Sequence, residues 1–150
     1  MSNITESVED DAGRVVTYRR HTNGGGLVCR GATVDPTALI QPTAYVEAGA
    51  RIGAGARIGA GSWINRRARI GMDAVIGEAV YVGPGAEIGD RVRIGSHSRI
   101  GARVQVGEGA SLDSDSTVPD GSVIPAPAVR SGHAALRRSG GRQELNSRAA

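Results

Sequence analysis

Every sixth residue from Val28 to Ile124 is isoleucine, valine or leucine, without exception. This column has seventeen members and holds ten of the eleven isoleucines in the chain. Two residues before each member stands a small residue or valine, as at Ala32, Ala38 and Ser62. Residues at spacing two point to the same side of an extended strand. Each six-residue repeat therefore predicts a short strand with two inward side chains and one outward side chain between them.

The residue after the aliphatic position predicts a corner. It is glycine in nine of the repeats between Gly53 and Gly107, and Asp35, Asn65 and Asp113 occupy the same position in three others. Glycine, asparagine and aspartate tolerate unusual backbone angles, so we interpret this column as turn residues. Prolines follow at the next position in three repeats, which also suits a corner: Pro36, Pro42 and Pro84.

Three strand-and-corner units would close a triangular coil of eighteen residues. Seventeen repeats make nearly six such coils, and a stacking distance of about 4.8 Å gives a prism roughly 25 Å tall. The composition agrees, because 23 glycines would be costly in a helical bundle and the abundance of isoleucine and valine argues against disorder. The chain has no phenylalanine, so the core must consist of aliphatic and small residues.

This pattern resembles the hexapeptide-repeat family over residues 28 to 128. The resemblance implies an all-β fold, a left-handed parallel β-helix of about six coils without inserted loops. The left hand comes from the family alone, since the usual crossover rule favours the opposite hand. We divide the chain into an N-terminal segment and cap (1–27), the β-helix (28–129) and an Arg-rich C-terminal tail (130–150) with the option of a short helix.

Within the N-terminal segment, residues 1 to 13 are polar and acidic, and we expect them to lack regular structure. The sequence of residues 14 to 27 predicts a strand and a glycine turn that cover the first coil. Capping is expected because the open end of a coil exposes unpaired backbone groups.

The resemblance leaves three classes of function open, since fold does not decide function. The family implies an acyl-CoA-dependent acetyltransferase or other acyltransferase acting on a hydroxyl or amine. The alternatives are a non-catalytic scaffold or oligomerisation module, and a carbonic-anhydrase-like metalloprotein. The last needs three histidines from adjacent coils, but of His21, His97 and His133 only His97 lies within the repeats. We therefore expect no metal.

The last coil supports the acyltransferase. Its sequence from Val118 to Ala128 resembles the C-terminal coil of acetyltransferases in this family, where a proline-rich turn lies near coenzyme A. Pro127 and Ala128 match that motif, and Arg130 would replace a missing lysine charge near the phosphates. The resemblance thus implies acetyl-CoA or another acyl-CoA as co-substrate, held by Pro127, Ala128 and Arg130. The alternative is that a final coil simply ends this way.

His97 is the candidate general base. An imidazole can remove a proton from a hydroxyl or amine that attacks a thioester. The repeat places Asp115 beside His97, one coil later, where it would orient the ring. The alternative is a plain surface histidine, because the position is a corner. The lone Cys29 has no histidine at a suitable spacing, and we assign it a structural role.

The absence of insertions within the seventeen repeats favours the scaffold. Enzymes of this family usually carry a projecting loop that supplies a catalytic or substrate-binding residue. Without one, a catalytic pocket must form where faces of different copies meet.

One outward line is aromatic. At a spacing of eighteen residues it runs Leu27, Tyr45, Trp63, Tyr81, Arg99 and Thr117. We expect the rings to stack about 4.8 Å apart, with Arg99 over Tyr81. Such an apolar strip usually marks an interface, and we expect a homotrimer, the common family assembly, to form through the Tyr45, Trp63 and Tyr81 face. The alternative is that residues 1 to 27 cover this face.

Charge and hydropathy restrict the partners. No apolar run approaches the roughly 18 residues of a membrane span, and the N-terminus is too acidic for a signal peptide, so we expect a cytoplasmic protein without a membrane partner. The net charge is +3, with acids spread among the arginines. The aromatic line lacks a surrounding basic groove, and we expect no nucleic acid.

Overall fold

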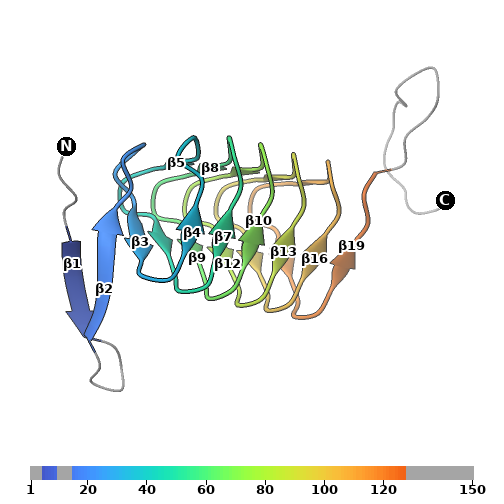
Figure 1. Ribbon diagram of the computed structural model, residues 1–150. Helices are drawn as coiled ribbons and strands as arrows, with labels where there is room; N and C mark the ends of the chain where they lie inside the picture. Colours follow the sequence, from blue (N-terminus) through green and yellow to red (C-terminus); the bar gives the residue numbers. More distant parts are fainter. Residues whose placement is uncertain (1–4, 10–14, 128–150) are drawn as a thin grey trace.

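The computed structural model describes residues 5–9 and 15–127, and all regular structure in this part is β-strand. The chain from β3 onward winds into stacked coils that advance steadily from the N-terminal to the C-terminal end (Figure 1). Three parallel sheets form the sides of this prism, so the predicted parallel β-helix is confirmed.

The strands of sheet A, in spatial order, are β1 (Thr5–Glu9), β2 (Val15–Arg20), β3 (Leu27–Cys29), β6 (Tyr45–Val46), β9 (Trp63–Ile64), β12 (Tyr81–Val82), β15 (Arg99–Ile100) and β18 (Thr117–Val118). Those of sheet B are β4 (Thr33–Val34), β7 (Arg51–Ile52), β10 (Arg69–Ile70), β13 (Glu87–Ile88), β16 (Gln105–Val106) and β19 (Val123–Ile124). Those of sheet C are β5 (Leu39–Ile40), β8 (Arg57–Ile58), β11 (Val75–Ile76), β14 (Arg93–Ile94) and β17 (Ser111–Leu112). The seventeen strands β3 to β19 make five complete turns and two sides of a sixth.

Register follows the predicted period of eighteen. Tyr45 pairs with Trp63, and Trp63 with Tyr81, along sheet A. The same offset joins Arg51 to Arg69 along sheet B. Every outward residue therefore has its repeat equivalents directly above and below it.

The core is the aliphatic column packed against the small column. Ile58, Ile64 and Ile100 are fully buried, as are Ala44 and Ala68. Burying an isoleucine side chain contributes about 2 kcal/mol to folding. The small residues leave room for the isoleucines of the other sides inside a narrow prism, which explains why the core needs no aromatic ring.

The glycine column has a different role from the one predicted. Gly53, Gly59 and their equivalents do not have positive φ angles. A Cβ at Gly59 would instead overlap the carbonyl oxygen of Gly77 in the next coil. These glycines are therefore required by the close approach of stacked coils, and the interpretation as residues with unusual backbone angles is wrong.

The left-handed backbone angles occur two positions later in each corner. Eight of these residues are not glycine: Thr43, Arg67, Asp73, Ala79, Arg91, His97, Arg103 and Asp115. A non-glycine residue in this conformation costs roughly 1 kcal/mol. Backbone hydrogen bonds between coils offset this cost, for example from His97 N to Glu78 O (2.9 Å) and from Asp115 N to Ser96 O (2.9 Å).

The N-terminal segment is more ordered than predicted. Residues 5–9 form β1, which pairs antiparallel with β2, so the expectation of no regular structure is wrong for them. The pairing partner lies in the next strand along the chain, and β2 in turn pairs with β3. The hairpin extends the edge of sheet A (Figure 1), and the ring of Tyr18 meets that of Tyr45 edge to face, with centroids 5.6 Å apart. Among the described residues of the hairpin, this contact leaves Tyr45 37% and Trp63 47% exposed.

The glycine turn caps the first coil as predicted. Gly26 N donates to Ile40 O (2.8 Å), and Ile40 N donates to Asn23 O (3.0 Å). The ring of His21 is buried, with Nε2 2.8 Å from the carbonyl oxygen of Ala38. These contacts satisfy the open backbone groups of sheet C at this end.

The tail from 130 to 150 lies outside the described residues, so the division into cap, β-helix and tail stays a prediction. In the part of the chain that the structure describes, there is no helix long and apolar enough to cross a membrane.

Candidate functional site

The outer face of sheet A carries the aromatic row, which we define as Tyr45, Trp63 and Tyr81. The guanidinium carbon of Arg99 lies 4.6 Å from the centroid of the Tyr81 ring, as predicted. The rings do not stack in parallel, because Trp63 and Tyr81 meet edge to face at 84°, with centroids 6.0 Å apart. This geometry brings the positive edge of one ring to the negative face of the other. Trp63 remains 47% exposed, so the row is open to a partner.

Glu47 anchors this face. Its carboxylate accepts a hydrogen bond from the Tyr18 hydroxyl (2.9 Å) and another from Trp63 Nε1 (2.7 Å). Burial, together with the hydrogen bond to Glu47, raises the pKa of Tyr18 well above its ordinary value, so this hydroxyl stays protonated and remains a donor. The network ties the N-terminal hairpin to the second and third coils.

Glu47 was not predicted as a functional residue, although the sequence holds a signal for it. Glu47 stands in the column that is glycine in most repeats, and Asn65 follows it one coil later. Asn65 Nδ2 donates to the Tyr81 hydroxyl (2.9 Å). Both departures from glycine therefore support aromatic side chains on sheet A.

Cys29 lies in the same column and is buried. Burial, and then the nearby Glu47 carboxylate, raises the pKa of its thiol. A thiol held protonated is a poor nucleophile, which agrees with the structural role assigned to it.

His97 and Asp115 lie at the corner between sheets C and A, in consecutive coils. Their backbones are stacked as the repeat predicts, and both side chains are exposed. No hydrogen bond joins the two side chains in the described structure. Their roles as base and orienting group stay predictions.

Pro127 is exposed and ends the described chain, just after β19. Ala128 and Arg130, the other two residues predicted to hold the cofactor, lie outside the described residues. A metal site finds no support in the described residues, where no three His, Cys, Asp or Glu side chains are grouped to hold an ion.

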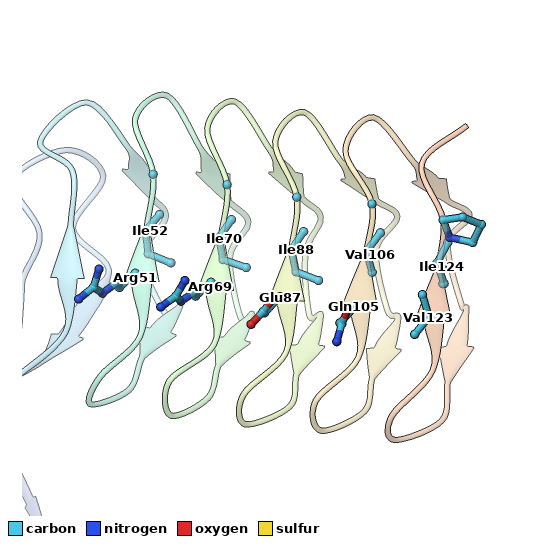
Figure 2. A pocket seen from close by; sticks show the side chains of 15 residues that line it. Arg51, Ile52, Arg69, Ile70, Glu87, Ile88, Gln105, Val106, Val123 and Ile124 are labelled. Carbon is cyan, nitrogen blue, oxygen red and sulfur yellow. The ribbon is translucent and has the colours of Figure 1, made fainter. Parts of the chain in front are cut away.

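A groove of about 530 Å³ runs along sheet B. Figure 2 shows its labelled outward side chains in one row, one from each of five successive coils. The row consists of Arg51, Arg69, Glu87, Gln105 and Val123. The groove forms because the next column along each coil is glycine, which leaves no side chains beside the row: Gly53, Gly71, Gly89 and Gly107.

The groove is polar at one end and apolar at the other. Arg51 and Arg69 stand at its N-terminal end, which we call the basic end. Val123, which is 67% exposed, and Pro125 stand at the C-terminal end. A spacing of eighteen residues places Arg51, Arg69, Glu87 and Gln105 on one outward line, but a groove could not be predicted from it, because no single repeat marks one.

One copy of the chain does not bring His97 to this groove. Sheets A, B and C form three sides of the prism, so the corner between sheets C and A is opposite sheet B. Among the described residues, those that line the groove include no histidine.

Comparison with protein families agrees with the fold and the repeats. Residues 67–102 match the family described as bacterial transferase hexapeptide (six repeats), and residues 91–126 match the hexapeptide repeat of succinyl-transferase. The fold and groove define a left-handed parallel β-helix protein. Residues 67–126 thus carry the hexapeptide repeat that both family descriptions name.

Solved structures of similar fold include two acetyltransferases. The acetyltransferase domain of PglB from Neisseria gonorrhoeae, in complex with acetyl coenzyme A, is 31% identical with a TM-score of 0.63, over 66% of this chain and 50% of that one. A histidine-to-asparagine variant of perosamine N-acetyltransferase from Caulobacter crescentus, in complex with CoA and GDP-perosamine, is 27% identical with a TM-score of 0.64, over 66% of this chain and 49% of that one. The chain thus spans about half the length of these proteins. No curated protein sequence matches the chain.

Proposed function

We propose that the protein is an acyl-CoA-dependent acyltransferase that acts on a hydroxyl or amine. The observation that carries the proposal is the 31% identity to an acetyltransferase domain bound to acetyl coenzyme A. The groove on sheet B supports it, because a volume of about 530 Å³ suits an elongated small molecule. Acetyl-CoA or another acyl-CoA would be the donor, entering at the apolar C-terminal end beside Pro127.

The complete site would lie between two copies in a homotrimer. In a threefold ring each interface joins two different surfaces. We place the aromatic row and the corner of His97 from one copy against the groove of the next. If the threefold axis is parallel to the prism, equivalent residues of all copies lie at the same height along it. His97 would then face the groove of the next copy at a level between Glu87 and Gln105.

His97 would act there as general base. It would take the proton from the acceptor hydroxyl or amine as that group attacks the thioester carbonyl. The new carbon–oxygen or carbon–nitrogen bond forms, the carbon–sulfur bond breaks, and the proton passes to the departing thiolate of coenzyme A. Asp115 would orient the imidazole. Since neither side chain has a partner among the described residues of one copy, the neighbouring copy or the substrate would bring the two groups into line.

The first experiment is calorimetric titration with coenzyme A and acetyl-CoA at two salt concentrations, with ADP as the control for simple phosphate attraction. We expect saturable binding that is tighter than for ADP and survives the higher salt. A screen of acceptors would follow, in which turnover is measured for wild type, His97→Ala and Glu87→Gln. The last variant tests whether the acid that lines the groove is the base instead. Loss of turnover in Glu87→Gln but not in His97→Ala would show that the base is not His97.

A scaffold or oligomerisation module is the second candidate. It is favoured by the uninterrupted coils from β3 to β19 and by a groove that, over the described part of one copy, is lined by no histidine. A folded and oligomeric protein that binds neither coenzyme A nor acetyl-CoA would support this function instead.

A further inference from the structure

The basic end of the groove holds two adjacent arginines. Arg51 and Arg69 are register partners on β7 and β10, and both are exposed. Figure 2 shows their side chains extending in the same direction, toward the N-terminal end of the row, with Glu87 one coil behind them. No carboxylate of the described residues forms an ion pair with either arginine, Glu87 included.

This arrangement places two like charges side by side in the free protein, and Glu87, the register partner of Arg69, is an opposite charge on one side of the pair only. Like charges at directly paired positions of neighbouring strands repel each other. The arginines of sheet C avoid that repulsion, because Val75 separates Arg57 from Arg93. The contrast between the two sheets indicates that the pair on sheet B has a use.

A third arginine lies near the same end. The Cγ of Arg67 would lie 3.1 Å from a Cβ at Gly49, so the stem of Arg67 lies beside a glycine two residues before Arg51. Two acids, Asp90 and Glu108, directly follow the lining glycines Gly89 and Gly107, and both already have partners. The carboxylate of Asp90 accepts a hydrogen bond from Met72 N (2.9 Å), and Glu108 forms an ion pair with Arg91.

We infer that the acyl acceptor is a phosphate-bearing molecule whose phosphate binds between Arg51 and Arg69. The guanidinium group has a planar set of donors that matches phosphate oxygens, and an anion between the two arginines removes their repulsion. This inference rests on the proposed function, which brings the donor from the apolar end. The two substrates then meet where His97 of the neighbouring copy faces the groove.

The dimensions agree with this placement. The reacting position lies about one and a half coils beyond Arg69, which is roughly 7 Å at the usual strand spacing. A phosphate and a hydroxyl or amine on opposite sides of one sugar ring, or at the ends of a short chain, are separated by a similar length. The acceptor class is therefore a small phosphorylated or diphosphate-linked alcohol or amine.

The test compares two double variants by calorimetry. Arg51→Gln with Arg69→Gln removes the two charges from the groove, and Arg57→Gln with Arg93→Gln removes two charges from sheet C as the matched control. All four side chains are exposed, and thermal unfolding with circular dichroism checks that each variant folds. Each protein is titrated with inorganic pyrophosphate and, separately, with coenzyme A.

We expect wild type to bind pyrophosphate saturably. The sheet B variant should bind it at least about tenfold more weakly, since two charge-assisted contacts are lost, and the sheet C variant should match wild type. Coenzyme A should bind all three proteins alike. Equal pyrophosphate binding by wild type and the sheet B variant would overturn the inference.

The remaining outcomes separate the inference from the proposed function. If the sheet B variant loses coenzyme A as well, the arginines hold the donor, and the assignment to the acceptor is wrong. If wild type binds pyrophosphate through these arginines but never binds coenzyme A, the anion site stands and its assignment to an acyl acceptor fails together with the proposed function.

Discussion

Sheets A and B have the same inward columns, but their outer faces differ. On sheet A, Glu47 and Asn65 follow the aliphatic residue and hold Trp63 and Tyr81 by hydrogen bonds. On sheet B the same column is glycine in four successive coils, which leaves a groove beside arginines that have no carboxylate partner in the described structure. The comparison shows that the buried aliphatic and small residues stabilise all three sheets in the same way. The chemistry of each outer face depends on two other columns, the outward residue of each strand and the residue that follows the aliphatic position.

The largest effect should come from breaking the aromatic row. Replacing Trp63 with arginine places a charge on the sheet A face, and a buried unpaired charge in an interface is strongly unfavourable. We expect light scattering to show the mass of a monomer instead of a trimer. Val75→Arg, at the same repeat position on sheet C, is the control and should leave the mass unchanged. A Trp63→Arg protein of unchanged mass would mean that sheet A does not form the interface.

The glycine column of sheet B offers the next test. A Cβ at Gly71 would lie 2.6 Å from the backbone nitrogen of Asp90, so Gly71→Ala must push two coils apart. We expect a loss of about 3 kcal/mol in the free energy of unfolding, measured with urea. Gly85→Ala is the control: it has a positive φ but only the flexible Cγ of Arg103 nearby, at 3.5 Å. It should lose about 1 kcal/mol from backbone strain alone. Similar losses in both variants would show that coil spacing adjusts easily.

The smallest of the three effects is expected from replacing a glutamate on each sheet, Glu47 on sheet A and Glu87 on sheet B. Glu47→Ala removes the acceptor of the buried Tyr18 hydroxyl, and we expect a loss of about 2 kcal/mol in the free energy of unfolding. Glu87→Ala on the exposed face of sheet B should change it by less than about 0.5 kcal/mol. An equal loss in the free energy of unfolding for both variants would contradict the view that outward side chains stabilise sheet A and do not stabilise sheet B.

The strict repeat made most of the fold predictable. A period of eighteen fixes which outward residues are neighbours, so the position of Arg99 over Tyr81 followed from the sequence. The edge-to-face geometry of Trp63 and Tyr81 did not follow, because it depends on side-chain torsion angles. The role of the glycine column was misjudged, since Gly59 responds to backbone eighteen residues away in the next coil.

The missed features depend on residues outside the repeat or on several coils at once. Tyr18 lies in the hairpin, twenty-nine residues from Glu47, and no periodic pattern links them. Strand β1 was missed because its polar sequence becomes a strand only through pairing with β2. The groove is a property of five coils together, so no motif of one repeat could reveal it.

Because equivalent coils stack at a constant distance, the number of coils determines the length of the groove. Each added or deleted block of eighteen residues would change the spacing between two points along sheet B by about 4.8 Å and leave every inward contact in place. The distance along the prism from the basic end to the level of His97 can therefore change only by whole multiples of the coil spacing. Relatives of this chain could select longer or shorter ligands by duplicating or losing one coil, with no substitution in the core.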